Sequence, residues 1–346
     1  MGEGPSTGWD LGGAHLKVAQ VGPDGRLITA VQVPCTLWRG MDHLARAVDE
    51  ARRSLVPSRR HGVTMTGELV DLFDGRADGV RRLIAAIVEA LPDAELRVYA
   101  GEAGFLLPAL AAERPQEVAS ANWHASVRFV AARCGGGLFV DLGSTTTDVV
   151  PFAKGRVANL GYTDAERLIS EELVYTGATR TPVMALADVV PFDGERQRLM
   201  AEYFATMADV HRLTGALPED ADQHPAADGR GKSAVDSARR LARMLGRDLD
   251  SAEMAAWRRL AAHLAERQRQ LLQAAFDRVL SRGLVDEDAP LVGAGVGRFL
   301  LPELARRMAR PYMDFADLLT GEPAAREWAA RCAPSAAVAA LVAEGG

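Results

Sequence analysis

A short segment of the chain, VDLGSTTTDVVPF at residues 140–152, places four consecutive hydroxyl side chains at the tip of a predicted buried hairpin. A glycine-rich turn between two strands lets backbone N–H groups approach a phosphate without obstruction by a Cβ atom. Hydroxyl groups at the tip add further donors. The segment therefore predicts a phosphate-binding turn, whose residues are Gly143, Ser144, Thr145, Thr146 and Thr147.

A second hairpin near the N-terminus, GWDLGGAHLKVAQV, repeats this pattern. Both segments have an apolar strand, then Asp-Leu-Gly, a small residue and a returning strand. The first turn contains Gly12 and Gly13, and its Asp10 corresponds to Asp141 of the second. The repetition suggests an internal duplication, in which two turns face each other and hold a phosphate chain from both sides.

A di- or triphosphate needs a cation, and Mg²⁺ is usually held by one or two carboxylates together with waters and phosphate oxygens. Asp10 and Asp141, at equivalent positions of the two turns, are the predicted metal ligands. Lys17, one of only three lysines, would add positive charge to the phosphates. The alternative is a pair of ordinary β-hairpins, because one Asp-Leu-Gly turn is weak evidence.

A third motif, APLVGAGVGRFLLPELA, ends an apolar strand in Gly293, Gly295 and Gly297 before a predicted helix. Taken alone, this spacing fits a dinucleotide site as well as any tight strand–helix connection; a role as a nucleotide- or substrate-side glycine turn is implied only by the family resemblance given below. The dinucleotide fingerprint would need a glycine where Arg298 stands. A Gly-Lys-Ser segment at 231–233 is not a P-loop, because Ala226 replaces its first glycine and no strand precedes it.

The elements that must position these motifs follow from hydrophobic periodicity. The first half reads as β-β-β-α-β-α-β, with strands at 9–11, 15–21, 27–33, 63–66 and 96–100 and helices at 42–55 and 80–91. The second hairpin then repeats the strand–turn–strand pattern with which the chain begins. The remainder is mostly helical, and its longest predicted helix covers residues 253–282.

Composition limits the class of protein. With 346 residues, the chain suits two lobes. A net charge of -6 disfavours a nucleic-acid partner. The three cysteines have no metal or disulfide spacing, and neither a signal peptide nor a membrane span is evident. We therefore predict a cytoplasmic protein without a membrane or nucleic-acid partner.

The three glycine motifs, in this order, resemble the phosphate and nucleotide motifs of the actin, sugar kinase and Hsp70 superfamily. That resemblance implies an α/β fold with two RNase H-like lobes around a central cleft. It places the first lobe at residues 1–135 and the second, with a helical insertion, at 136–333. Residues 334–346 would form a C-terminal helix packed back on the first lobe.

A closer resemblance covers nearly the whole chain. The segments GWDLGGAHLKVA, TMTGEL, ASANWHA, DLGSTTTDVVP, EELVYTGATRTPV, ADGRGKSAVDSARRLARM and GAGVG are similar to hydantoinase/oxoprolinase-related proteins of tetrahydromethanopterin-linked one-carbon metabolism. This resemblance implies a transferase of methanofuran biosynthesis. It would join an (aminomethyl)furanylmethyl diphosphate to the phenol oxygen of a γ-glutamyl-tyramine- or tyrosine-type acceptor and release diphosphate.

Such a reaction benefits from a base near the phenol, and Glu68 and Glu172 are the candidates, with a surface or capping role as the alternative for each. Asp148 is predicted to support the hydroxyl residues, and His124 to have a structural role. Two other functions stay open. One is an ATP-dependent kinase or amidohydrolase-like enzyme, and the other is a non-catalytic nucleotide-binding protein of the pathway.

Overall fold

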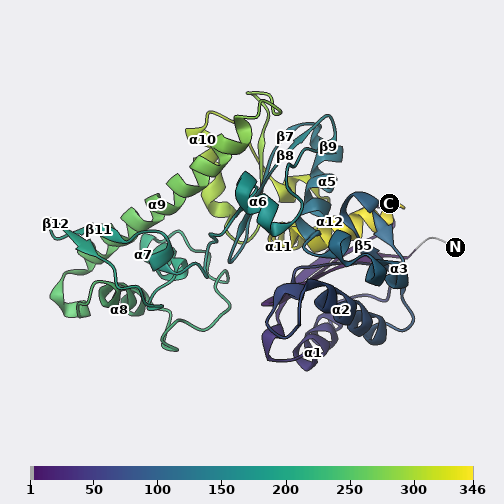
Figure 1. Cartoon of the computed structure of the whole chain (residues 1–346), viewed down its shortest axis with the longest axis horizontal. Helices are drawn as coiled ribbons and strands as arrows, with labels where there is room; N and C mark the ends of the chain where they lie inside the picture. The colour runs from purple at the N-terminus through teal and green to yellow at the C-terminus, as the bar shows by residue number, and fades with distance from the viewer. Residues whose placement is uncertain (1–3, 346) are drawn as a thin grey trace.

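The computed structural model describes residues 4–345 and contains two sheets of the same plan (Figure 1). In the first sheet the order is β3-β2-β1-β4-β5-β6, with β1 antiparallel to β2 and parallel to β4. Its strands are β1 (Ser6–Leu11), β2 (His15–Val21), β3 (Leu27–Pro34), β4 (Arg60–Met65), β5 (Glu95–Tyr99) and β6 (Phe105–Leu106).

The second sheet repeats this arrangement around a central strand. Its order is β10-β8-β7-β13-β14, with β9 also paired to β8, and β7 is antiparallel to β8 and parallel to β13. The strands are β7 (Gly137–Leu142), β8 (Thr147–Ala153), β9 (Arg156–Val157), β10 (Leu173–Val174), β13 (Leu291–Ala294) and β14 (Tyr312–Asp314). The two-lobed α/β fold predicted from the sequence is confirmed.

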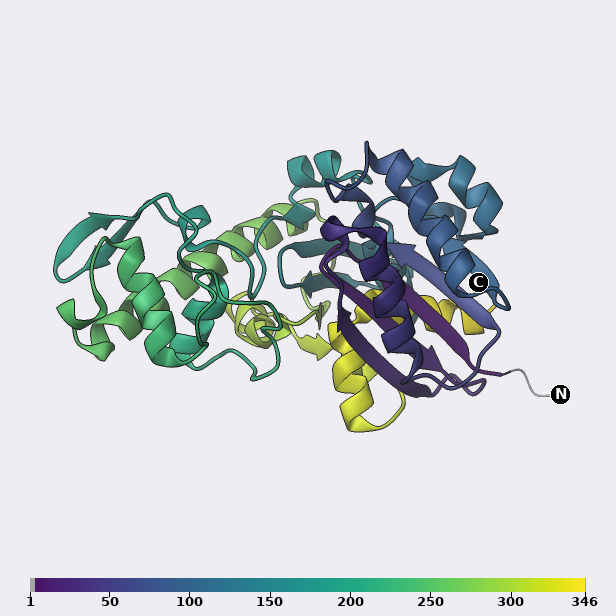
Figure 2. The same cartoon turned by 90° about the horizontal axis from the view of Figure 1, so that it is seen from below.

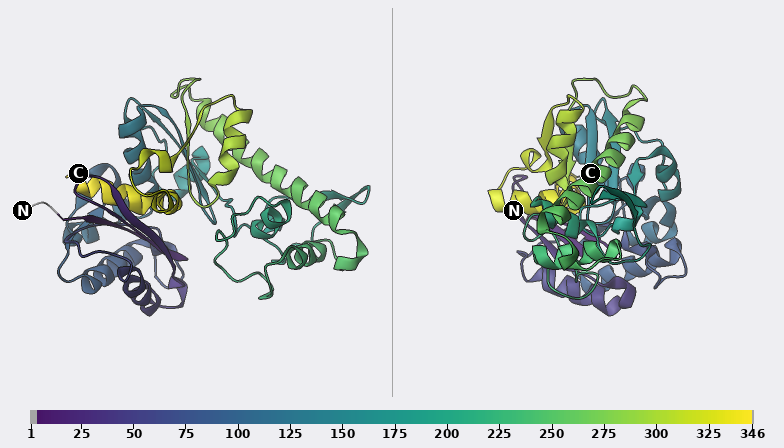
Figure 3. Two further views of the ribbon diagram at one scale, coloured as in Figure 1. Left: turned by 180° about the vertical axis from the view of Figure 1, so that it is seen from behind. Right: turned by 90° about the vertical axis from the view of Figure 1, so that its left-hand side faces the viewer.

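Three helices fill the space between the two sheets: α5 (Asn122–Cys134), α11 (Pro323–Arg331) and α12 (Ala333–Ala343). The C-terminal helix α12 packs on β1, β2 and β4 and also against α5 (Figure 3). The shared core contains Ala19 and Ala30 of the first sheet and Phe139 and Phe152 of the second. This layer fixes the two lobes relative to each other.

The outer faces are covered by separate helices. On the first sheet these are α1 (Met41–Arg52) and α2 (Arg76–Ala90), with the short α3 (Pro108–Glu113) and α4 (Pro115–Val118) beside them. The second sheet packs against α9 (Met254–Leu280) and α10 (Leu301–Arg307), while α6 (Asp164–Ser170) leads into β10. Among residues 4–345, no helix has both the length and the apolar character that a membrane span requires.

A helical insertion extends away from the lobes (Figure 2). It contains β11 (Val189–Phe192), β12 (Glu195–Arg198), α7 (Met207–Thr214), α8 (Ala234–Met244) and the first half of α9. The helix α9 serves two cores, because Trp257 and Leu264 pack in the insertion while Leu272 and Phe276 pack on the second sheet. It therefore ties the insertion firmly to the second lobe.

The connection between α7 and α8, residues 215–233, is called the bridging loop here. Arg240 is fully buried beneath it and binds Asp209 at 2.6 Å and Asp228 at 3.0 Å. Lys232 lies 3.4 Å from Asp222, so the Gly-Lys-Ser segment belongs to this ionic network, and no strand leads into it as a P-loop requires.

The bridging loop also contacts elements on the far side of the cleft. The amide of Gln32 on β3 donates to Gln223 at 2.9 Å, and Asp220 lies 2.8 Å from Arg331 of α11. The insertion thus spans the opening between the lobes.

Close packing between β1 and α12 generates a stability prediction. A methyl group at Gly8 would lie 2.0 Å from the Ser335 carbonyl oxygen and 2.5 Å from the Ala339 nitrogen. Gly8→Ala should therefore displace α12 and lower the free energy of unfolding by about 1–3 kcal/mol. Urea denaturation measures this loss, and Gly4→Ala, which has open space around it, is the control. Equal midpoints for the two variants would contradict the packing argument.

Candidate active site

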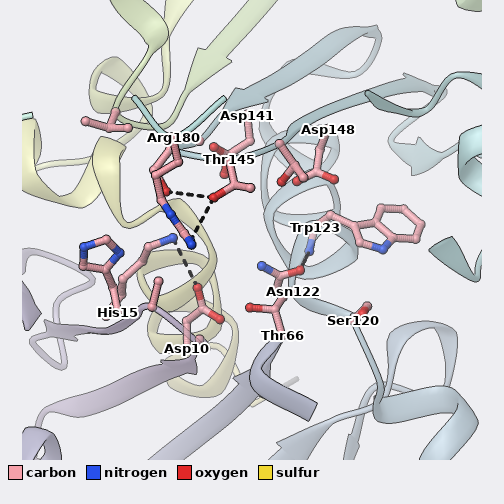
Figure 4. Close-up of a pocket in the computed structure, with 18 of the residues that line it drawn as sticks. Asp10, His15, Thr66, Ser120, Asn122, Trp123, Asp141, Thr145, Asp148 and Arg180 are labelled. Carbon is pink, nitrogen blue, oxygen red and sulfur yellow. Dashed lines mark hydrogen bonds and ion pairs between the residues drawn. The ribbon is translucent and has the colours of Figure 1, made fainter. Parts of the chain in front are cut away.

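The two predicted turns meet at a cavity of about 380 Å³ between the lobes (Figure 4). From the first lobe, Asp10, Gly12 and Gly13 line it, and from the second, Asp141 and the segment 143–146. The arrangement follows from the repeated fold, because each aspartate lies near the end of the central strand of its sheet, just before the turn. Two segments distant in sequence therefore face one another.

The two aspartates are buried and poorly compensated. Asp10 is 1% exposed, its Oδ2 lies 3.6 Å from Lys17 Nζ, and its Oδ1 has no hydrogen-bond partner. Burial raises the pKa of Asp10, and Lys17 opposes the shift. Burial also raises the pKa of Asp141 to about 7, again against the attraction of Lys17. Among the described residues, Asp141 forms no ion pair.

This pair is suited to a hard cation. Carboxylate oxygens are the ligands that Mg²⁺ prefers, and the unpartnered Oδ1 of Asp10 is a free ligand atom. No group of three or more His, Cys, Asp or Glu side chains able to hold a metal occurs within residues 4–345. A cation here would therefore complete its coordination with water or phosphate oxygens, as Mg²⁺ commonly does.

The predicted phosphate-binding turn is supported by residues 176–181. The backbone N–H groups of Thr179 and Arg180 donate to the Ser144 carbonyl at 3.2 and 2.8 Å. Gly177 packs so closely that a Cβ atom would lie 2.4 Å from the Thr145 nitrogen. The Arg180 guanidinium donates to the Thr145 hydroxyl at 3.2 Å. The turn is therefore held rigidly with its outer groups in the cavity.

Three of the four predicted hydroxyl residues line the cavity, namely Ser144, Thr145 and Thr146. Thr147 does not, because it begins β8, is fully buried and donates its hydroxyl to the Thr176 carbonyl at 2.6 Å. Its role in the structure is to hold the turn on the segment beneath it.

Neither candidate base reaches the cavity. Glu172 is fully buried, accepts from the Gly161 N–H at 3.0 Å and pairs with Arg282 at 2.7 Å. Glu68 lies behind Ser120, whose hydroxyl donates to it at 2.8 Å, and burial raises the pKa of Glu68. These placements correct the predicted role of both residues: Glu172 anchors a connection, and Glu68 positions Ser120.

The glycine turn after β13 also differs from its predicted role. Val296 lines the cavity, whereas the three glycines do not. The N–H of Gly295 donates to the Ala330 carbonyl at 2.8 Å, and that of Gly297 to the Leu142 carbonyl at 2.7 Å. A Cβ at Gly293 would lie 2.6 Å from the Tyr312 hydroxyl oxygen. These glycines allow close packing, and the N–H groups of Gly295 and Gly297 are already engaged by the protein.

Several further residues line the cavity; the sequence predicts a supporting role for one of them, Asp148, and leaves Tyr175 as either a pocket-lining or a packing residue. Asp148 pairs with Arg167 at 2.8 Å, and Arg167 in turn stacks 4.1 Å from the Trp123 ring. Trp38 and Tyr175 line the cavity with much of their surfaces exposed. The others are Arg180, His15, His224, Asn122 and Ser120. His124, by contrast, bonds the Tyr99 hydroxyl at 2.8 Å within the core, which is a structural contact.

Residues 59–314 match the hydantoinase/oxoprolinase family. The chain belongs to that family. A curated relative from Methanocaldococcus jannaschii, named (4-{4-[2-(γ-L-glutamylamino)ethyl]phenoxymethyl}furan-2-yl)methanamine synthase, is 31% identical over 245 residues, which are 70% of this chain and 71% of the relative. A protein of the same name from Methanococcus vannielii is 34% identical over 113 residues, covering 33% of this chain and 50% of the relative.

Solved structures agree with the fold of this family member. The nucleotide-free structure of acetone carboxylase, whose description concerns ATP-dependent acetone carboxylation, superposes with a TM-score of 0.51 at 12% identity. The match covers 84% of this chain and 66% of that one. At this identity the likeness concerns the fold alone, which is the two-lobed actin-like architecture.

The buried state of Asp141 generates a pH prediction. Its pKa is raised from 3.8 to about 7, so the folded protein binds a proton more tightly than the unfolded chain within that window. The free energy of unfolding should therefore fall as pH rises from about 4 to about 7. Asp141→Asn, which cannot titrate, should lack this contribution. Urea denaturation in chelator across that range measures the difference, with the exposed Asp74→Asn as control. The prediction is wrong if the free energy of unfolding changes with pH in the same way for wild type and Asp141→Asn.

Proposed function

We propose that the protein is a transferase that joins a furanylmethyl diphosphate to the oxygen of a phenol and releases diphosphate, in methanofuran biosynthesis. The observation that carries the proposal is the cavity itself, where two glycine turns, two buried carboxylates and Lys17 converge. The names of the two curated relatives support the choice of substrates, because their product contains a phenoxymethyl-furan ether.

The reaction balances without an oxidant or reductant. The bond between the furanyl methylene carbon and the diphosphate oxygen breaks, and its electron pair leaves with the diphosphate. The phenol oxygen forms the new bond to that carbon, and its proton passes to the released diphosphate or to water. The furan oxygen delocalises positive charge on the methylene carbon. The enzyme's main contribution is then to stabilise negative charge that develops on the leaving group.

The residues present fit that demand. The N–H and hydroxyl groups of residues 144–146, together with Lys17, would bind the diphosphate oxygens. Asp10 and Asp141 would hold a Mg²⁺ ion, which neutralises leaving-group charge when bound. The exposed rings of Trp38 and Tyr175 offer apolar surface for aromatic substrates. Tyramine- and tyrosine-based phenols are both compatible with this arrangement.

An ATP-dependent kinase or amidohydrolase-like activity is the second candidate, supported by the acetone carboxylase fold. A nucleotide would use the same turns for its phosphates. The leaving anion separates the two reactions, because the transferase releases diphosphate and a kinase-coupled reaction consumes ATP.

The carboxylates are tested first. Asp10→Asn and Asp141→Asn should each reduce turnover by a hundredfold or more, because each removes a charge that would anchor the cation. The assay incubates the protein with (aminomethyl)furanylmethyl diphosphate, γ-glutamyl-tyramine and Mg²⁺, and follows the ether product by mass spectrometry. Undiminished turnover in excess EDTA would rule out the metal role.

The hydroxyl residues are tested in the same assay. Thr145→Ala or Thr146→Ala should slow product formation about a hundredfold, since loss of one preorganised donor to a developing anion costs about 2.7–4 kcal/mol. Melting temperatures should stay close to that of the wild type. Thr320→Ala, an exposed threonine outside the cavity, is the matched control. A coupled assay then identifies the anion, and orthophosphate from ATP appearing in step with product would replace the transferase with the kinase-like function.

A further inference from the structure

One positive charge in the cavity has no carboxylate partner. Lys17 pairs with Asp10, Arg167 with Asp148 at 2.8 Å, and Arg331 with Asp220 at 2.8 Å. Arg180 forms no ion pair within residues 4–345, and its guanidinium bonds the Thr145 hydroxyl at 3.2 Å. A guanidinium that lines a cavity without a counter-charge is a natural position for an anionic ligand.

Two imidazoles lie in the same part of the cavity. The rings of His15 and His224 meet edge to face, with centroids 4.5 Å apart. His15 is 7% exposed, and the Nε2 atoms of both rings are buried without a hydrogen-bond partner. Burial lowers the pKa of His15 to about 3, and Arg180 acts in the same direction. Burial also lowers the pKa of His224, and each ring has an unsatisfied polar atom that a ligand could bond.

These side chains come from three separate parts of the chain. His15 begins β2 of the first lobe, Arg180 belongs to the segment beneath the second turn, and His224 lies on the bridging loop. Figure 4 shows Arg180 and His15 on one side of the cavity, with Trp123 and Ser120 on the other. The groups therefore converge only when both lobes and the insertion are in place.

We propose that Arg180, His15 and His224 form an anion subsite that binds the terminal phosphate of a diphosphate or triphosphate. The subsite rests on the proposed function. It extends that function by assigning these three residues to the phosphate group that lies farthest from the reacting carbon. A guanidinium matches phosphate oxygens bidentately, and the neutral imidazoles supply N–H donors. Because Arg180 bonds Thr145, the subsite is continuous with the phosphate-binding turn.

A carboxylate of the acceptor is the other anion that could bind an arginine. The contact with Thr145 favours phosphate, because it places Arg180 beside the donors that hold the diphosphate. Bound phosphate would also contact His224, so the ligand would hold the bridging loop against the first lobe. Preventing loop opening in this way would keep water from the activated methylene carbon.

Calorimetric titration of the full chain with inorganic pyrophosphate and Mg²⁺ tests the subsite. Arg180→Gln should weaken binding about ten- to a hundredfold, the range expected for loss of a hydrogen-bonded charge. His15→Gln and His224→Gln should weaken it by a smaller factor. The control is Arg81→Gln, an exposed arginine of α2 with the same change in net charge. Melting temperatures verify that each variant is folded, and Arg180→Lys should recover part of the affinity.

A second titration with a non-hydrolysable ATP analogue distinguishes the sources of the phosphate. Weaker binding of either polyphosphate by Arg180→Gln supports the subsite, and the probe that binds more tightly to wild type identifies its source. The subsite would be overturned if Arg180→Gln bound pyrophosphate as tightly as wild type does, and also bound the ATP analogue as tightly. The transferase proposal would then still stand. Absence of any polyphosphate binding by wild type would also overturn it, and the mass-spectrometric assay then decides the transferase proposal separately.

Discussion

Two carboxylates buried on opposite sides of one cavity, with a single lysine between them, impose the main constraint on this molecule. Burial raises the pKa of both Asp10 and Asp141, the nearby charge of Asp148 adds to the shift, and Lys17 offsets only part of it. Such an arrangement persists only if the lobes cannot relax apart. The layer formed by α5, α11 and α12, with its core of alanine and phenylalanine side chains, supplies that rigidity.

The same constraint explains the contacts beneath the second turn. Gln268, fully buried in the middle of α9, donates to the Thr176 hydroxyl at 2.9 Å and the Gly177 carbonyl at 2.8 Å. Residues 176–181 in turn hold the Ser144 carbonyl. The helix that joins the insertion to the second sheet therefore also supports the phosphate-binding turn, so a displacement of the insertion would be transmitted to the cavity.

Local pattern was sufficient to predict the hairpins, because an apolar strand, an Asp-Leu-Gly turn and a returning strand are contiguous in sequence. Strand β1 and helix α9 lie close to their predicted positions. Long-range packing was not accessible in the same way. Glu172 has the residue type of a base, but its partner Arg282 lies 110 positions later in the chain, just after α9. Likewise, nothing adjacent to His224 indicates that it meets His15.

The glycine motifs show why residue type alone does not define a site. All four N–H groups donate to protein carbonyls, but Gly12 and Gly143 bond within their own turns and line the cavity, whereas Gly295 and Gly297 bond Ala330 and Leu142 outside it. Gly12, Gly295 and Gly297 need a missing Cβ, since a side chain there would come within 2.5 Å of neighbouring atoms, whereas at Gly143 a Cβ would lie 3.2 Å from the Thr146 carbonyl oxygen. The two pairs differ in whether their backbone faces the cavity. The first pair leaves room for an anion between the lobes, and the second brings β13 and α11 close enough to close the wall behind Asp141.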